Sequence, residues 1–309
     1  MGGDDGTAGG SVGAAVLRPP RLRAPRRAEL GLLGERLGLD GLLEVGCPLD
    51  LGRDARVAEV GGRVVGTCWV RVVSGLSVFS ADGAEAFFDA LVDPDRHATE
   101  AAALVGWAVA RATSIGTVHQ LLTDVGVPEA AGPLGPFGFH HDRDLHVLVH
   151  ERPHAFAAPT WPAGTSLAGA PPTVPLVVAA CDAAFADVPG YGGATAAIVE
   201  RVLSHPSTDA NLCLVALRGG EVAGFCYSRV ERSGGAVCGW VEDLGVAPAA
   251  RRIGLGRALL RHSVRALAER GATSVVLGVD AANPPARRLY ETSGFTRSGT
   301  LSRYRLGLR

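Results

Sequence analysis

The fold of this chain is decided by the stretch Val246-Ala247-Pro248-Ala249-Ala250-Arg251-Arg252-Ile253-Gly254-Leu255-Gly256-Arg257-Ala258-Leu259-Leu260. A short apolar run ends at Pro248, and two arginines and two glycines follow it. Apolar residues then recur at helical spacing, at Leu255, Leu259, Val264, Leu267 and Ala268. This pattern predicts a strand that passes through a tight loop into the N-terminus of a helix.

Such a loop is suited to bind an anion. The first backbone N–H groups of a helix are unpaired and lie at the positive end of its dipole. Glycine, which has no Cβ, lets a phosphate approach them, and arginine adds charged donors. A dinucleotide-binding motif would need glycine at Leu259, and no Gly-Lys-Ser/Thr follows for a P-loop. The alternative is an ordinary helix start with no ligand.

Two motifs resemble those of the GCN5-related N-acetyltransferase (GNAT) family. Arg251, Gly254 and Gly256 follow the Arg-x-x-Gly-x-Gly pattern of its coenzyme A pyrophosphate loop. The segment from Asn283 to Phe295 is similar to the family element Asn-x-x-Ala-x-x-Leu-Tyr-x-x-x-Gly-Phe. From the residues alone, Asn283 is a natural N-cap, and Tyr290 lies two turns further along the same helix face. An N-cap followed by a core tyrosine is the alternative for this segment.

The resemblance implies a mixed α/β sheet flanked by helices and acetyl-CoA as co-substrate. It also implies that Asn283 contacts the cofactor and that Tyr290 protonates the departing thiolate. Backbone groups of one strand would pair with the pantetheine arm, namely those of Leu244, Gly245 and Val246. The loop that would hold the pyrophosphate consists of Arg251, Arg252, Ile253, Gly254, Leu255, Gly256 and Arg257.

Glu242 is the candidate general base for the acceptor amine. Strict alternation along the strand places Glu242 on the same face as Leu244 and Val246, and Asp243 on the other. A glutamate on an apolar strand can have a raised pKa and accept a proton. The alternative is a surface or ion-paired carboxylate. Asp187 and Tyr191 lie in a segment that either shapes the acceptor pocket or simply links two helices.

The chain contains one unit written twice. Val57, Val92, Gly116 and Gly138 match Val215, Val246, Gly271 and Gly294 at separations of 158, 154, 155 and 156 residues. This regularity indicates an internal duplication. We predict a disordered tail at 1–13, a degenerate GNAT-like domain at 14–152, a linker at 153–163 and a catalytic GNAT domain at 164–309.

The N-terminal copy has lost the ligand-binding residues of the motifs. His97, Glu100 and Ala102 stand where the second copy has Arg251, Gly254 and Gly256. A carboxylate in the anion loop repels the pyrophosphate. Val127 and Leu134 likewise replace Asn283 and Tyr290. We therefore expect a catalytically silent N-terminal half, an architecture that is similar to that of mycothiol synthases.

Composition excludes several other classes of protein. The 30 basic and 31 acidic residues favour neither nucleic acid nor membrane as a partner. The six cysteines lack Cys-x-x-Cys spacing, which predicts buried free thiols and no metal site. We expect a cytoplasmic monomer or homodimer that acetylates a primary amine of a small molecule. The alternative is a non-catalytic regulator or scaffold that binds acyl-CoA.

Overall fold

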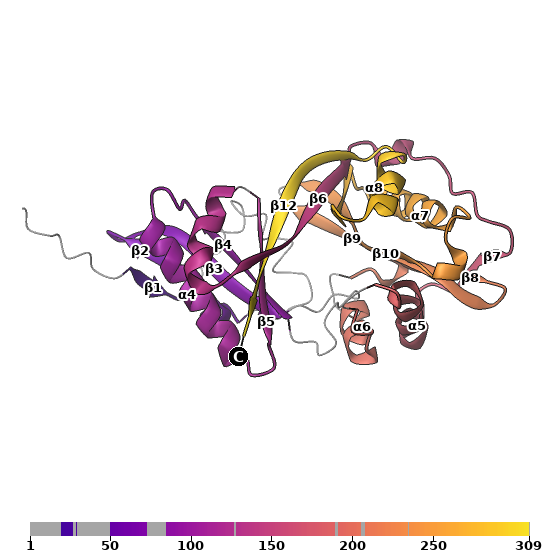
Figure 1. Ribbon diagram of the computed structural model, residues 1–309. Coiled ribbons are helices and arrows are strands. Elements are labelled where there is room, and N and C mark those ends of the chain that lie inside the picture. The colour runs from indigo at the N-terminus through magenta and orange to yellow at the C-terminus, as the bar shows by residue number, and fades with distance from the viewer. Residues whose placement is uncertain are drawn as a thin grey trace, which may run out of the picture.

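The protein is described from a computed structural model over residues 20–26, 29, 50–72, 85–126, 128–188, 191–204, 208–233 and 235–308. The predicted tail 1–13 lies outside these ranges, as do Cys47 and Val127. Within them the fold is a mixed α/β sheet with helices packed on it, as the sequence predicts (Figure 1).

Strands and helices alternate in the order expected for two related halves. The first half contains β1 (Arg21–Arg23), α3 (Leu51–Asp54), β2 (Ala55–Val60), β3 (Arg63–Val72), β4 (Glu85–Val92), α4 (Ala98–Ser114), β5 (Gln120–Val125) and β6 (His140–His150). The second half contains β7 (Thr165–Leu167), α5 (Val174–Phe185), α6 (Ala196–Leu203), β8 (Cys213–Arg218), β9 (Glu221–Ser233), β10 (Ala236–Val246), α7 (Leu255–Glu269), β11 (Ser274–Asp280), α8 (Pro284–Glu291) and β12 (Thr296–Gly307).

The duplicated hairpins appear as β2–β3 and β8–β9. Both are antiparallel pairs closed by a Gly-Gly turn, at Gly61-Gly62 and at Gly219-Gly220. All four glycines have positive φ, which this tight turn requires. The matched residues Val57 and Val215 thus lie in the same kind of hairpin in both halves.

The two halves exchange their last strands. One twelve-stranded sheet runs in the order β1-β2-β3-β4-β5-β12-β6-β11-β10-β9-β8-β7. β6 leaves the N-terminal half to pair with β11, and β12 returns from the C-terminal half to pair with β5. Figure 1 shows these two strands crossing the middle of the molecule between the halves. Each half of the sheet is therefore completed by a strand of the other.

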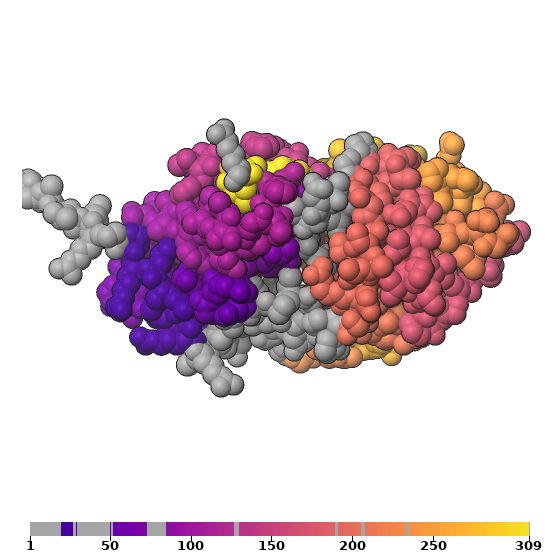
Figure 2. Space-filling model, turned by 90° about the horizontal axis from the view of Figure 1, so that it is seen from below, coloured from indigo at the N-terminus to yellow at the C-terminus, as the bar shows by residue number. Residues whose placement is uncertain are grey.

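Three apolar clusters hold the helices against the sheet. One lies under α4 in the N-terminal half, around Phe88 and Leu104. A second lies between the sheet and α7 with α8, around Leu259 and Tyr290, and a third lies under α5 and α6, around Phe225. In Figure 2 the segment of α5 and α6 (salmon) covers much of the visible face of the C-terminal half.

The strand exchange makes a testable stability prediction. Leu148 on β6 is 2% exposed and packs into the core of the C-terminal half. Leu148→Ala should lower the free energy of unfolding by about 2–5 kcal/mol because it leaves a cavity there. Hydrogen exchange should report lost protection first in β11. Leu121, buried in the N-terminal core, provides the matched control, and Leu121→Ala should lower protection first in β4. If both variants lose protection in the same strands, the strand exchange between the halves is contradicted.

Candidate active site

The candidate site begins where two parallel strands separate. β10 and β11 pair only from Cys238–Ser274 to Val241–Leu277. Beyond that point β10 stays bonded to β9 as far as Val246, whereas β11 stays bonded to β6 as far as Asp280. The strands therefore leave a wedge-shaped opening in the sheet, bordered by the predicted pantetheine strand.

The three residues of that strand play different parts. Leu244 and Val246 point toward α7, because both side chains lie near the position that a Cβ on Gly256 would take. A Cβ on Gly245 would lie 2.6 Å from Cβ of Ala184, so α5 can pack here only against glycine. The carbonyl of Val246 already accepts a hydrogen bond from Nε of Arg251 at 2.9 Å.

The loop after β10 ends in an uncapped helix N-terminus. Gly254, at φ 93°, is the N-cap of α7, and no side chain of the described residues caps this helix. Its first N–H groups belong to Leu255, Gly256 and Arg257, which have no intrahelical acceptor. A Cβ on Gly254 would meet nothing within 4 Å. The space beside Gly254 is thus open, as the approach of an anion to the helix start requires.

Arg251 is committed within the protein. Its guanidinium makes a two-pronged ion pair with Asp187 (2.5 and 2.7 Å) and donates to the carbonyl of Ala184 at 3.2 Å. This pairing lowers the pKa of the Asp187 carboxyl below its usual range. Arg251 therefore fastens the loop to the end of α5. Asp187, which the sequence offers as a possible contact for an amine, is occupied by this pair.

The other arginines of the loop are exposed. Arg252 has a positive φ of 62°, the one non-glycine residue of the described chain to do so. Arg257, in the first turn of α7, donates to Oγ1 of Thr292 at 2.9 Å, next to the end of α8. Among the described residues, Arg251 is ion-paired with Asp187, whereas Arg252 and Arg257 form no ion pair.

The second motif folds as its residues predict. Oδ1 of Asn283 accepts the N–H of Ala286 at 3.2 Å and caps α8, with Pro284 as the first helical residue. Tyr290 is 7% exposed, and its ring packs edge-on to Phe295 with 6.1 Å between centroids. Burial raises the pKa of the Tyr290 hydroxyl well above its usual range, and Cys226 and Asp243 act in the same direction. The phenol is therefore held protonated.

Strict alternation fails at Glu242. A β-bulge lies between Val241 and Asp243, so Glu242 has no partner in the ladder with β9. Its carboxylate is ion-paired with Arg229, which also bonds Glu231. The expectation that Glu242 shares a face with Leu244 and Val246 is wrong. The bulge turns Glu242 toward the face on which Arg229 lies, and an ion-paired carboxylate is what the structure holds there.

Asp243 is a buried carboxylate on the face of the strand opposite to that of Leu244 and Val246, as strict alternation predicts. It is 9% exposed and lies directly opposite Tyr227 on β9, on the side of the sheet that α5 and α6 cover. A signal for it exists in the duplication. Asp89 lies opposite Trp69 in the same register of the N-terminal half, at separations of 154 and 158 residues from Asp243 and Tyr227.

The loop that follows α5 is ordered by a tyrosine. The hydroxyl of Tyr191 donates to Oδ1 of Asp182 at 2.8 Å, and the same oxygen accepts the N–H of Ala194. Burial raises the pKa of Tyr191, and the hydrogen bond to Asp182 raises it further. Pro189 and Gly190 of this loop lie outside the described residues.

The N-terminal half keeps the opening and lacks the anion loop. β4 and β5 pair only from Glu85–Gln120 to Phe87–Leu122 and then separate. Nδ1 of His97 lies 3.7 Å from Glu100, which occupies the first turn of α4. A 3₁₀ helix at Pro128–Phe137 replaces the equivalent of α8, and Leu134 in it is 3% exposed. The sequence match and the helix starts differ here, because His97 is the N-cap of α4 as Gly254 is of α7, and Glu100 lies three residues further into its helix.

Known proteins resemble both the C-terminal half and the whole fold. The profile of the Acetyltransferase (GNAT) family matches residues 192–295. A mycothiol acetyltransferase of Thermobispora bispora is 35% identical over 177 residues, 55% of this chain and 60% of that protein. A GCN5-related N-acetyltransferase from Sphaerobacter thermophilus has a TM-score of 0.71 at 22% identity and covers 94% of this chain and 96% of its own. A tandem GNAT protein from the clavulanic acid biosynthesis pathway has a TM-score of 0.63 at 18% identity, over 93% and 98%.

Residues 192–295 therefore match the profile of the GNAT acetyltransferase family, and the chain has the fold of the tandem GNAT protein. The relatives that the chain resembles in sequence are mycothiol acetyltransferases. The chain aligns with about 39 to 60% of the length of these proteins.

Other site classes receive no support from the described part of the chain. Within it, no group of three or more His, Cys, Asp or Glu residues is arranged to hold a metal ion. The five described cysteines are free thiols, four of them buried and Cys238 half-buried. Among the described helices, none combines the length and apolar character needed to cross a bilayer.

Proposed function

We propose that this protein transfers the acetyl group of acetyl-CoA to a primary amine of a small molecule, by direct attack within a ternary complex. The observation that carries this proposal is the uncapped N-terminus of α7 beside the opening between β10 and β11, with buried Tyr290 nearby. The resemblance to mycothiol acetyltransferases supports acetyl as the group and a small molecule as the acceptor.

The residues present fit coenzyme A. The N–H groups of Leu255, Gly256 and Arg257 would hold the pyrophosphate, because Gly254 leaves their approach open. The edge of β10 from Leu244 to Val246 would pair with the pantetheine arm, although the carbonyl of Val246 is shared with Arg251. Asn283 would hold the start of α8 in place and so position Tyr290.

Two proton transfers accompany the reaction. The amine nitrogen forms a bond to the acetyl carbon, and the bond from that carbon to sulfur breaks. Glu242 accepts the proton that the amine nitrogen loses, and Tyr290 donates its hydroxyl proton to the departing sulfur. A phenol that keeps its proton can donate it to the sulfur as the carbon–sulfur bond breaks, although it is a weaker acid than a thiol, whose ordinary pKa is about 8.5. Holding both reactants in place supplies most of the remaining rate enhancement.

The role of Glu242 can be tested against its neighbour. Glu242→Gln is expected to lower kcat/KM for the amine by roughly a hundredfold or more, because a positioned base contributes about that much. Asp243→Asn is the comparison, since it removes one charge from the adjacent residue of the same strand. Thiol release should be followed at several pH values with both variants. If Glu242→Gln keeps full activity while Asp243→Asn loses it, the proton acceptor is Asp243.

The proposed activity has one competitor from another class, an acyl-CoA-binding regulator or scaffold without turnover. Acetyl-CoA-dependent thiol release should be measured with a panel of primary amines, alongside calorimetric titration of acetyl-CoA. Turnover with at least one amine supports the enzyme. Tight binding of acetyl-CoA without turnover on any amine supports the regulator.

We also infer that the N-terminal half is catalytically silent, because in the sequence match Leu134 and Glu100 replace the proton donor Tyr290 and the glycine Gly254.

A further inference from the structure

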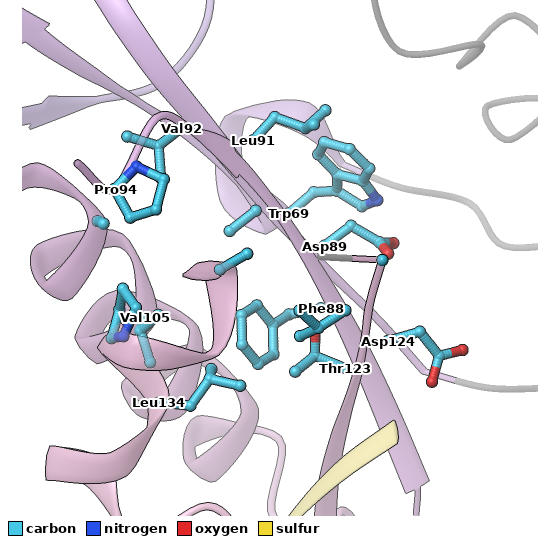
Figure 3. Close-up of a pocket in the computed structure, with 16 residues that line it drawn as sticks. Trp69, Phe88, Asp89, Leu91, Val92, Pro94, Val105, Thr123, Asp124 and Leu134 are labelled. Atoms are coloured by element: carbon cyan, nitrogen blue, oxygen red, sulfur yellow. The ribbon is translucent and has the colours of Figure 1, made fainter. Parts of the chain in front are cut away.

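A separate cavity lies in the N-terminal half, at the opening between β4 and β5. It has a volume of about 430 Å³, within the usual range of small-molecule sites. Its apolar part is lined by side chains under α4, among them Phe88, Val105 and Leu134. Figure 3 shows these side chains on one side of the strands and the polar ends of Trp69 and Asp89 on the other, close together. The cavity thus joins an apolar floor to a polar end.

The cavity occupies the position that the candidate active site has in the other half. Val92 at its rim corresponds to Val246, and Leu134 to Tyr290. Asp89 opposite Trp69 corresponds to Asp243 opposite Tyr227. The duplication has therefore kept the carboxylate and aromatic pair while it lost the proton donor and the anion loop. A site with these losses can bind and cannot catalyse the same transfer.

The charge of the cavity wall selects the kind of ligand. Of the lining residues, Asp89 and Asp124 are acidic and none is basic. Arg303 neutralises Asp124 through two hydrogen bonds of 2.8 Å. Nε of Arg71 lies 3.7 Å from Oδ2 of Asp89, too far for a hydrogen bond. Arg71 and Asp89 therefore form an ion pair without a hydrogen bond, and the Asp89 carboxylate can still receive a donor.

Two buried polar atoms of this pair lack a partner. Oδ2 of Asp89 and Nε1 of Trp69 are inaccessible to solvent and make no hydrogen bond, although Trp69 as a whole is 5% exposed. An unsatisfied buried polar group costs about 1–3 kcal/mol, more when it is charged. Burial raises the pKa of Asp89, and the neighbouring charge of Arg71 acts against this rise. A ligand that donates to Asp89 removes this cost.

We propose that this cavity binds a small amine in its ammonium form, with its apolar body under α4 and its charge against Asp89 and the Trp69 ring. The ammonium donates to the carboxylate of Asp89, and an aromatic face stabilises the same cation. Glu100 at the start of α4 and the acidic wall exclude phosphates and carboxylates. This site is independent of acetyl transfer in the other half.

Three ligands of equal shape test the proposal in the full-length protein without acetyl-CoA: tryptamine, tryptophol and indoleacetic acid. The readout is the indole N–H resonance of Trp69 among those of the four tryptophans, assigned with Trp69→Phe. Tryptamine should shift this resonance and saturate it, with an affinity at least about tenfold higher than that of the alcohol or the acid. Asp89→Asn should lower the affinity for tryptamine by about tenfold and leave that for tryptophol unchanged.

Asp95→Asn is the matched control, because it removes the same charge from an exposed residue of the same half. It should bind tryptamine as the unaltered protein does. The proposal is overturned if the acid or the alcohol binds as well as the amine, if Asp89→Asn has no effect, or if tryptamine leaves the Trp69 resonance unmoved. Melting temperatures of both variants distinguish loss of the site from loss of the fold.

Discussion

Replacing Tyr290 by phenylalanine is expected to lower kcat for acetyl transfer by roughly ten- to a hundredfold, because the thiolate then leaves without a positioned donor. The loss should fall on kcat more than on KM for acetyl-CoA, since the hydroxyl acts on the breaking bond. The ring itself remains, so its packing against Phe295 and the core under α8 persists. The initial rate of thiol release at saturating acetyl-CoA measures the effect.

The pH dependence of this residue has a definite sign. Burial raises the pKa of Tyr290 above its ordinary value of 10.0, so the hydroxyl keeps its proton as the pH passes that value. The part of the rate that depends on Tyr290 should therefore persist to pH 10. Tyr304→Phe removes a hydroxyl from half-buried Tyr304 on β12 and is the matched control. Equal rates of Tyr290→Phe and the unaltered protein across the pH range would remove Tyr290 from the mechanism.

Local features of the site could be predicted because neighbouring residues determine them. The turn into α7 at Gly254 and the cap of α8 at Asn283 both depend on backbone preferences within a few positions. The commitment of Arg251 to Asp187 could not be predicted, because 64 residues separate the partners and only the packing of α5 brings them together. The bulge at Glu242 was missed for a related reason. One extra residue in a strand leaves no mark in an alternating pattern, and its position depends on the partner strand.

The arrangement of the two halves shows the same limit. The duplication indicates two similar units, and the hairpins β2–β3 and β8–β9 and the helices α4 and α7 appear at matching places. The exchange of β6 and β12 cannot be read from similarity, because a strand has the same sequence whichever sheet it completes. Its consequence is physical. The N-terminal half supplies β6 to the sheet that holds the candidate site, so the stability of the site depends on a segment of the other half.

Gly254→Glu is expected to raise KM for acetyl-CoA by about a hundredfold or more, because two like charges about 4 Å apart near a protein surface repel by about 4 kcal/mol. The substitution installs in the C-terminal half the residue that the N-terminal half carries as Glu100. A side chain at this position meets open space, so it adds charge without a steric clash. Initial rates over a range of acetyl-CoA concentrations measure the effect, which should shrink as salt screens the repulsion.

Gly254→Gln separates charge from backbone strain. Both variants force a side chain onto a residue at φ 93°, and the left-handed conformation costs an ordinary residue about 1–2 kcal/mol. Strain is therefore common to both, and the difference in KM between them is the electrostatic effect alone. A KM for Gly254→Gln close to that of Gly254→Glu, and insensitive to salt, would mean that the loop binds no anion. A large, salt-dependent difference would support an anion bound at the start of α7.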